Sequence, residues 1–374
     1  MRKLFVITLG MLLAVPAIAD VMPTIYGKVN REIQMKSFES KATGAKEIST
    51  IRPTDVANAE TRIGVKGEYQ FNDHTAKYVL ELGANSSNTN TDGTLRIRHS
   101  YVDFGGFWGS FVTGQTDVAG DGLGLKLDPL SGTSAGLAGV DAAALYNYRA
   151  DSLRNQFPVY GIGYFYRSRQ ELVGYKSPVF AGIQYYTSID NSSETAAVGL
   201  AYNKTTVWAN QLSFERKFGE IDFGLYATYS TISNGGIKDA TIMGGGLSVG
   251  FMNFVLSGMY SKAELTDGSL VDAKASESTP IMIAAKYTFL DTNTVAVTYG
   301  KRSNEDANAA AGAQKDNINQ LAFGYIKQLH KNVSVRASYG MIEKKHDNAT
   351  ENVATDGTAG FEATVAAVGT TITF

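Results

Sequence analysis

The C-terminal segment Ala359–Phe374, AGFEATVAAVGTTITF, decides the fold class. Its residues alternate between two kinds of side chain. One set is mostly apolar and ends in an aromatic ring: Ala366, Val368, Thr370, Ile372 and Phe374. The other set is small or polar: Ala367, Gly369, Thr371 and Thr373. A period of two indicates a β-strand with different environments on its two faces. About ten such residues can cross a membrane as a tilted strand, although the last strand of a soluble β-protein would show the same pattern.

The N-terminal segment 1–19, MRKLFVITLGMLLAVPAIA, predicts export from the cytoplasm. Arg2 and Lys3 precede an apolar run, Leu4–Val15, and Ala17-Ile18-Ala19 has the small residues of a cleavage site. The run is too short for a comfortable transmembrane helix. We therefore predict a signal peptide over residues 1–19 and a single β-domain over residues 20–374.

The composition narrows the class of protein further. The chain has 39 Gly, 20 Tyr and only 7 Pro, and its mean hydropathy is −0.12. No later segment approaches the length of a membrane-spanning helix. The absence of Cys excludes disulfides and thiol chemistry. Charges of both signs are mixed along the chain, without the basic block that would suggest a nucleic-acid partner.

Tight turns alternate with longer polar stretches along the whole chain. The tight turns are Phe71–Thr75, Gly105–Gly109, Ser177–Gly182, Phe218–Phe223, Phe251–Phe254, Phe289–Asn293 and Gln328–Asn332. Six of these seven turns carry aromatic residues. The first long polar stretch, residues 36–58, is expected to be a loop. Short turns at one rim and long loops at the other are typical of an outer-membrane β-barrel, which also leaves no unpaired strand edge.

Several motifs, taken in order, resemble one known family. They are Tyr26-Gly27, Thr61–Gly67 (TRIGVKG), Asp103–Ser110 (DFGGFWGS) and Tyr175–Gly182 (YKSPVFAG), together with the terminal Phe374. This set resembles the general trimeric porins of Gram-negative outer membranes over most of residues 20–374. The resemblance implies an all-β transmembrane barrel in outer-membrane lipid and lipopolysaccharide, a homotrimer, and a water-filled channel in each subunit. It also implies that Phe374 helps the assembly machinery to recognise the chain.

Two departures from that family lie near the expected pore. Gln115 stands where an Arg usually follows Gly in the fifth strand. Asp128–Gly132 (DPLSG) lies near the place of the Pro-Glu-Phe-Gly-Gly motif of the third loop. The family's ion selectivity is therefore not carried over to this chain unchanged.

The strand count depends on one ambiguous run. Seven hairpins with a first and a last strand give about sixteen strands, enough for an aqueous channel. Four alternating runs nevertheless fall where only three strands fit: Ala181–Ile189, Thr195–Asn203, Thr206–Lys217 and Ile221–Ile232. Because bacterial single-chain barrels have even strand numbers, we expect Thr195–Asn203 to lie above the membrane. Eighteen strands remain the alternative.

The longest stretch without alternation, residues 117–159, is expected to fold into the barrel as a constriction loop. A structureless loop of this length needs a reason, and its polar groups could meet those of the wall. The porin resemblance implies the same arrangement, with Asp121 and Asp128 supplying acidic groups. An exposed surface loop is the alternative.

A basic wall is expected opposite this loop. Charges on the lipid face cost about 2–4 kcal/mol at the midplane, so charged strand positions should face the lumen. The expected pore residues are Arg62, Lys66, Arg98, Arg167 and Arg169, of which Arg62 and Arg98 match the porin basic cluster. Cations facing the loop acids would create a transverse field. The alternative is that some arginines form salt bridges that only stiffen the barrel. We expect this, or a position near a rim, for Arg96 and Arg336.

Other residues that suggest chemistry have structural interpretations. The four histidines, His74, His99, His330 and His346, are scattered, and their spacing fits neither a metal site nor a nucleophile–base pair. His99 has the outward parity of its strand. Gly120–Gly124 lacks the context of a phosphate-binding loop. Gly244-Gly245-Gly246 is expected to permit close contact within a strand.

The leading functional hypothesis is a porin that passes small hydrophilic solutes and ions by passive diffusion, with no reaction, metal or cofactor. An outer-membrane enzyme would need a Ser, His and carboxylate set that the histidine positions do not provide. A surface adhesin or antigen displayed on a barrel remains open. So does a substrate-specific channel, because such channels line their path with aromatic residues, and tyrosines are numerous here: Tyr146, Tyr148, Tyr160, Tyr164 and Tyr166.

Overall fold

The computed structural model describes residues 22–40, 48–56, 61–85, 94–136, 169–192, 205–234, 238–267, 275–306, 314–346 and 360–374. The predicted signal peptide, residues 1–19, lies outside this part of the chain. Within the described residues no helix is long and apolar enough to cross a membrane.

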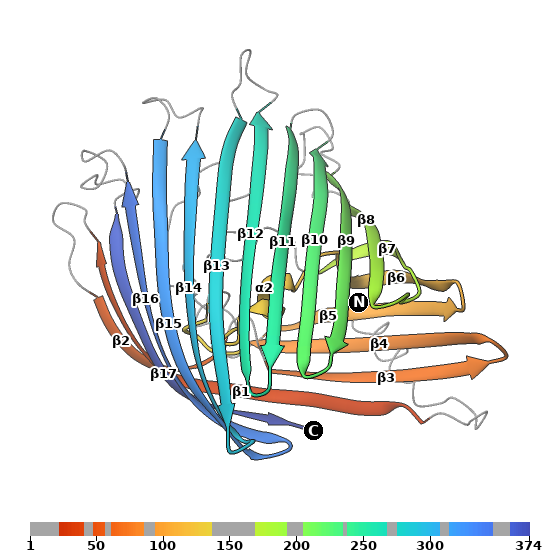
Figure 1. Ribbon diagram of the computed structural model, residues 1–374, viewed down its shortest axis with the longest axis horizontal. Coiled ribbons are helices and arrows are strands. Elements are labelled where there is room, and N and C mark those ends of the chain that lie inside the picture. Colours follow the sequence, from red (N-terminus) through yellow and green to blue (C-terminus); the bar gives the residue numbers. More distant parts are fainter. Residues whose placement is uncertain are drawn as a thin grey trace.

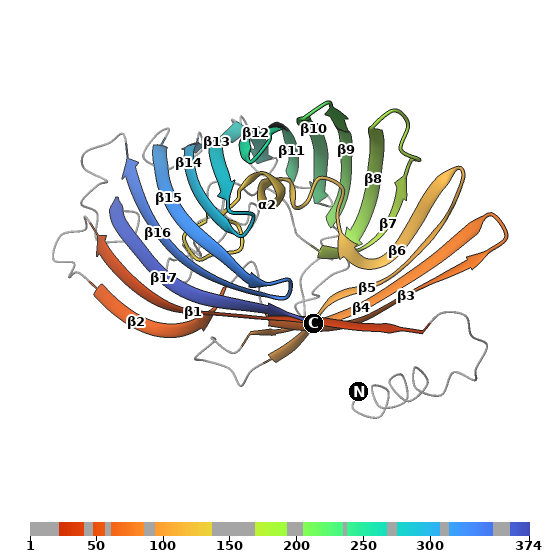
Figure 2. The same cartoon turned by 60° about the horizontal axis from the view of Figure 1, so that its bottom comes forward.

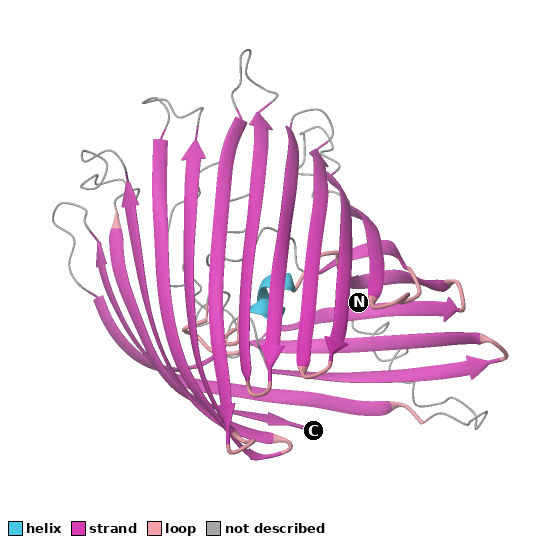
Figure 3. Ribbon diagram, viewed as in Figure 1, coloured by secondary structure: helices cyan, strands magenta, loops and turns pink. Residues whose placement is uncertain are grey.

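Antiparallel strands make up almost all of the described chain (Figure 1, Figure 3). The segments are β1 (Thr24–Ser40), β2 (Ile48–Asp55), β3 (Thr61–Phe71), β4 (His74–Asn85), β5 (Thr94–Gly106), β6 (Gly109–Asp117), β7 (Arg169–Lys176), β8 (Ile183–Ser192), β9 (Thr205–Phe218), β10 (Ile221–Asn234), β11 (Lys238–Phe251), β12 (Phe254–Asp267), β13 (Ala275–Phe289), β14 (Asn293–Asp306), β15 (Gln314–His330), β16 (Val333–His346) and β17 (Phe361–Thr373). One short helix, α2 (Leu123–Leu127), follows β6.

The sheet closes on itself as a barrel of sixteen strands. Apart from β2 and β3, consecutive strands pair in antiparallel fashion, and β17 returns to pair with β1 from Lys28↔Thr373 to Ser40↔Phe361. The segments β2 and β3 both pair with β1, at Arg31↔Asp55 and Lys28↔Arg62, so they are two parts of one interrupted barrel strand. The predicted fold class and strand number are therefore confirmed.

The first hairpin corrects one expectation. Residues 36–58 were expected to form a loop, but β1 continues to Ser40 and β2 occupies Ile48–Asp55. The paired residues in this region include Phe38↔Ile48 and Met35↔Ile51, so apolar side chains recur even where the stretch is polar on average. The polar composition concealed a hairpin that extends the barrel wall.

The seven predicted tight turns are all present between paired strands. In the described part of residues 181–232 the strands are β8, β9 and β10, and Thr195–Asn203 itself lies outside the described residues. Aromatic rings gather beside the early tight turns. Phe104 lies 6.0 Å from Phe71 and from Trp108 between ring centroids, and Phe111 lies 5.4 Å from Trp108.

The two faces of the wall differ as the period of two requires. On β1, Ile33 on the outer face is 59% exposed, whereas the neighbouring inward Glu32 is 2% exposed.

Phe374 closes the last strand by exchanging backbone hydrogen bonds with Gly27, at 3.0 and 3.1 Å. A Cβ atom at Gly27 would lie 2.4 Å from the Phe374 ring, so the ring lies directly over this glycine.

Candidate functional site

Inside the barrel, the chain beyond β6 follows the wall (Figure 2). We call residues 118–136 the inner loop segment; they are the described part of the predicted constriction loop, and residues 137–159 lie outside the described residues. The wall residues that hydrogen-bond to the segment include, in order along it, Ser188 (β8), Gln211 and Glu215 (β9), Ser257 (β12), Thr298 (β14), Glu32 and Gln34 (β1) and Gln320 (β15). The segment thus lines one arc of the lumen, from β8 round to β1.

Apolar contacts also fasten the segment to this arc. Leu123 and Leu127 of α2 form a buried cluster with Tyr226, Met259 and Met282 of the wall. Burying a leucine side chain stabilises by about 1.5–3 kcal/mol. The next leucine, Leu130, is buried against two small wall residues, Ala296 and Ala322.

Wall glycines make room for these leucines. A Cβ atom at Gly246 would lie 2.4 Å from Leu127 Cδ1, and one at Gly324 would lie 2.3 Å from Leu130 Cδ2. The expectation that the Gly244–Gly246 run permits close contact is therefore confirmed at Gly246. The element that packs closely against Gly246 is the helix α2.

The predicted acidic residue Asp128 stabilises the segment locally. Its Oδ1 atom accepts hydrogen bonds from the Leu130 backbone N–H at 2.9 Å and from the Thr298 hydroxyl at 2.8 Å. Asp128 therefore caps the turn after α2 and binds it to β14. Asp128 is only 2% exposed, so these hydrogen bonds are shielded from water.

On the other side of the lumen, Arg62 of β3 and Arg98 of β5 converge on Glu81 of β4. The Arg98 Nε–Glu81 Oε1 distance is 2.7 Å and the Arg62 Nε–Glu81 Oε2 distance is 3.5 Å. Lys28 of β1 lies opposite Arg62 in the sheet and within electrostatic range of Arg98. We call Lys28, Arg62 and Arg98 the basic wall.

Sequence reasoning brought Arg62 and Arg98 together but missed Lys28 and Glu81. Both missed residues lie on the polar parity of their strands, which was the available signal. Lys66 lies on the same face as Arg62, with its ammonium 5.3 Å from the centroid of the Tyr26 ring. The Tyr26 hydroxyl in turn donates to Glu81 at 3.1 Å.

A bulge in β5 corrects the expectation for His99. The register against β4 runs Glu81↔His99 and then Leu82↔Ile97, so Arg98 is an extra residue. A bulge lets two consecutive side chains face the same side. As a result, His99 lies inside near Glu81 (Nε2–Oε1 4.0 Å) and the Thr116 hydroxyl (3.4 Å). The predicted outward position of His99 is wrong.

Arg169 and Asp121 lie near each other where the inner loop segment begins. Arg169 is the first residue of β7 and pairs with Asp117, and its charge interacts with those of Arg98 and Asp121. Burial, together with the neighbouring Asp117 carboxylate, raises the pKa of Asp121 well above its usual range. Arg167 lies outside the described residues.

The parity expected for β7 is also wrong. In this strand Leu172 is 3% exposed and Val173 is 60% exposed, so even-numbered residues face inward and odd-numbered residues face outward. Arg169 and Glu171 have odd numbers and therefore share the outward face. Leu172 belongs to an inner apolar cluster with Val112, Val118 and Val207. Arg169 therefore reaches the inner charges from the end of the strand. Arg336 forms the kind of ion pair expected of it, with Glu32 as its partner.

Comparisons with known proteins agree with this architecture. A family model described as "Gram-negative porin" matches residues 6–347. No curated protein matches the chain. Among the described residues there is no group of three or more side chains able to hold a metal ion.

Solved structures with a similar fold include three outer-membrane proteins. An anion-selective porin from Comamonas acidovorans has a TM-score of 0.68 and 16% identity, covering 95% of this chain and 100% of that one. OmpF of Salmonella typhi in complex with daunomycin has a TM-score of 0.58 and 16% identity, covering 94% and 97%. A trimer form of OmpT from Vibrio cholerae has a TM-score of 0.56 and 13% identity, covering 95% and 100%.

The family match covers most of the chain, and the closed barrel is the fold of its structural neighbours. Together they place the protein in the outer membrane of a Gram-negative bacterium. The chain belongs to the Gram-negative porin family.

Proposed function

We propose that the barrel is a water-filled channel for passive diffusion of small hydrophilic solutes and ions, narrowed by the loop over residues 117–159. The observation that carries this proposal is the path of the inner loop segment. It occupies one arc of the lumen, and α2 contacts β11 and β12, which lie half-way round the closed sheet from β4. A solute therefore passes between this loop and the basic wall.

The charges support a preference for anions beside the basic wall. Lys28, Arg62 and Arg98 carry three positive charges against the single negative charge of Glu81, a local excess of two. Lys66 adds further positive charge near this face, whereas the charge of Arg169 is offset by its partner Asp117. On the loop side, Asp128 is committed to Thr298 and Leu130, and Asp121 is buried beside Asp117, which raises its pKa. Within a Debye length of about 8 Å at physiological salt, such charges act on a passing ion.

The test is a planar-bilayer recording of the purified protein across a tenfold KCl gradient. A stable ohmic conductance with a reversal potential on the anion side is expected. A barrel that inserts but passes no current would contradict the channel function, and a cation-side reversal potential would contradict the assigned charge preference. Liposome swelling with sugars of increasing size then gives the size limit.

We also propose that the protein is a homotrimer, in contact with outer-membrane lipid and lipopolysaccharide, that carries no catalytic activity. The motif resemblance and the trimeric Vibrio cholerae neighbour support the trimer. The family and fold, which are those of channels, support the absence of catalysis. Light scattering of the detergent-extracted protein should give three times the mass of one chain; a monomer mass would contradict the trimer.

A further inference from the structure

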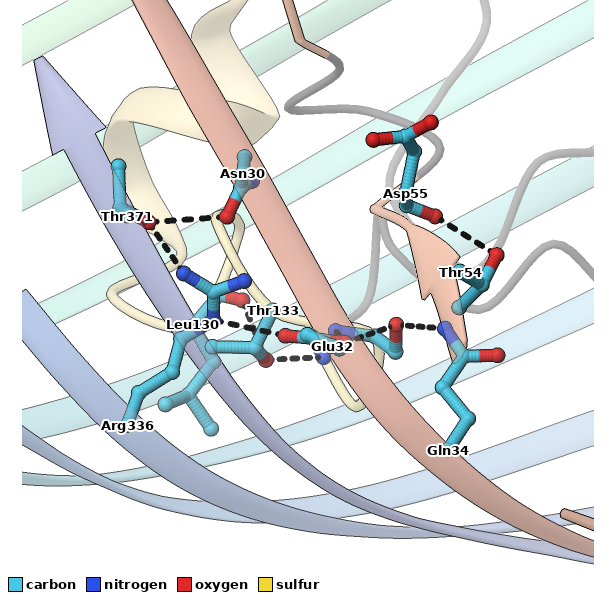
Figure 4. A network of polar contacts seen from close by, with 11 residues as sticks. Asn30, Glu32, Gln34, Thr54, Asp55, Leu130, Thr133, Arg336 and Thr371 are labelled. Carbon is cyan, nitrogen blue, oxygen red and sulfur yellow. Dashed lines mark hydrogen bonds and ion pairs between the residues drawn. The ribbon is translucent and has the colours of Figure 1, made fainter. Parts of the chain in front are cut away.

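An ion pair crosses the line where the barrel closes. Arg336 of β16 donates through Nε to Glu32 Oε1 of β1 at 2.7 Å, with the two side chains 4% and 0% exposed. The same guanidinium donates through Nη1 to the Thr371 hydroxyl of β17, which donates to Asn30 Oδ1 of β1 at 2.9 Å (Figure 4). We call β16, β17 and β1 the closing seam. These contacts join its three strands.

The inner loop segment binds to the other oxygen of the same carboxylate. Ser134 donates to Glu32 Oε2 from its backbone N–H at 3.3 Å and also from its hydroxyl. Gln34, two residues along β1, donates from its side-chain amide to the Ser134 hydroxyl. Glu32 is therefore shared, with one oxygen holding the seam and the other holding the loop.

This anchor differs in kind from most of the others along the segment. Ser188, Gln211, Ser257 and Gln320 bind the segment through neutral groups. Two other anchors carry a charge: Lys126 forms an exposed ion pair with Glu215, and the Asp128 carboxylate accepts from Thr298. Hydrogen bonds to an ionised acceptor are stronger than those between neutral groups. A buried carboxylate also needs a positive partner, because an isolated buried charge is strongly unfavourable. The Ser134 contact therefore depends on Arg336, which acts on it through Glu32.

The closing strand provides the space for this carboxylate. A Cβ atom at Gly369 of β17 would lie 2.4 Å from Glu32 Cγ and 3.0 Å from Arg336 Nη2. The Glu32–Arg336 pair can occupy its place only against a glycine on the paired β17. The acceptor for Ser134 is thus assembled by the same strand pairing that closes the barrel.

We propose that Glu32 and Arg336 are positioning residues of the channel, which hold the end of the inner loop segment against the closing seam through Ser134. The inference rests on the proposed function, because it assumes that this loop narrows the path. It adds that the width of the path is set by the seam: the loop takes its place only when β17 is paired with β1.

The first experiment separates the loop contact from barrel stability. Ser134→Ala removes the hydroxyl that donates to Glu32 and accepts from Gln34, and Ser134→Thr retains a hydroxyl. Ser213→Ala is the matched control, because this lumen-facing serine donates to the Gln184 carbonyl of the wall and not to the loop. In single-channel recordings, Ser134→Ala should show transitions to conductance sublevels roughly tenfold more often than wild type, as expected for a lost bond to a charged group. The Ser134→Thr and Ser213→Ala traces should match wild type, and all three melting temperatures should be unchanged.

The second experiment tests the dependence on the seam. Arg336→Met keeps an elongated side chain but leaves Glu32 without its counter-charge. It should lower the melting temperature of the barrel and also raise the sublevel frequency to at least that of Ser134→Ala. A lower melting temperature with wild-type traces would overturn the coupling between seam and loop. So would Ser134→Ala traces that match wild type, or a Ser134→Thr variant as noisy as Ser134→Ala. If wild type itself conducts no current, the proposed channel function fails instead.

Discussion

Glu81 is the single carboxylate on which the geometry of the basic wall depends. It lies between Arg62 and Arg98 and also accepts from Tyr26. Its two arginine partners differ in burial, since the Arg62 side chain is 28% exposed and the Arg98 side chain is 6% exposed. The exposed arginine can therefore act on ions in the lumen, while the buried one mainly balances the charge of Glu81.

This difference gives a prediction for two matched variants. Arg62→Gln should move the reversal potential toward cations with little change in stability, because partly exposed ion pairs contribute only about 0–1 kcal/mol. Arg98→Gln should destabilise the barrel by about 3–5 kcal/mol, because it leaves a buried charge without its closest partner. Reversal potential and melting temperature of both variants are measured side by side. Equal loss of stability in the two would contradict this division of roles.

Asp121 provides a pH-dependent prediction. Its pKa is raised in the folded state by burial and by Asp117, so the folded protein binds the proton more tightly than the unfolded chain does. This contribution favours folding at pH values below the pKa in the unfolded chain. It is lost progressively as the pH rises through the raised pKa. Asp121→Asn should therefore raise the melting temperature more at pH 7 than at pH 4.

The matched control for this measurement is Asp73→Asn, in the exposed turn between β3 and β4. This variant removes one acidic charge from an exposed turn and so controls for the change of charge itself. An Asp121→Asn variant with the wild-type pH dependence would show that this carboxyl does not titrate with folding.

At the scale of elements, the period of two predicted the strands, the tight turns and the closing strand, but it misplaced faces in two strands. The bulge at Arg98 reverses the parity of β5, and a parity count cannot register an inserted residue. In β7, Leu172 faces inward because the start of the inner loop segment, Val118 and Ala119, covers it with apolar groups. The assumption that inward means polar fails wherever the loop packs on the wall.

The candidate site shows the same limit. Arg62 and Arg98 could be predicted because they combine strand parity with a family motif. The bonds of Asp128 to Thr298 and of Ser134 to Glu32 join residues far apart in the sequence, at separations of 170 and 102. No local pattern encodes such contacts, so the course of the inner loop segment had to come from the structure.

The docking of the segment on the wall predicts the effect of removing one leucine. Leu130→Ala removes a fully buried side chain and should weaken docking by about 2–5 kcal/mol. The strand pairing does not involve this residue, so the open-channel conductance should rise while the melting temperature of the barrel stays constant. The exposed Leu329→Ala is the control. Unchanged conductance in Leu130→Ala would mean that the docked segment does not limit the path.

The closing strand predicts the effect of removing the last residue. Deleting Phe374 removes two backbone hydrogen bonds and the ring that covers Gly27. The amount of heat-modifiable, folded protein in the outer membrane should fall, and Phe374→Tyr, which retains the ring, should preserve it. Normal folded levels in the deletion variant would show that this residue is dispensable for assembly.

At the scale of the whole molecule, the charge asymmetry of the lumen predicts a dependence on ionic strength. The Debye length falls from about 30 Å at 0.01 M salt to about 3 Å at 1 M. The anion preference should therefore be larger for a tenfold gradient at low KCl than for the same ratio at high KCl. The check is the pair of reversal potentials measured on one inserted channel. A preference that does not change with salt would place the selecting charges out of contact with solvent.

The pairing of β1 with β17 has a consequence for the kinetics of folding. Gly27 and Phe374 bond across a separation of 374 − 27 = 347 residues, the most distant partners that the described chain offers. Contacts of such long range form slowly, because the entropy of the intervening chain must be lost first. Until they form, the two outermost strands present unpaired backbone groups, and open edges of this kind aggregate readily. The incompletely closed barrel is therefore the species most prone to aggregation. Its lifetime is set by how fast the first and last strands of the barrel pair.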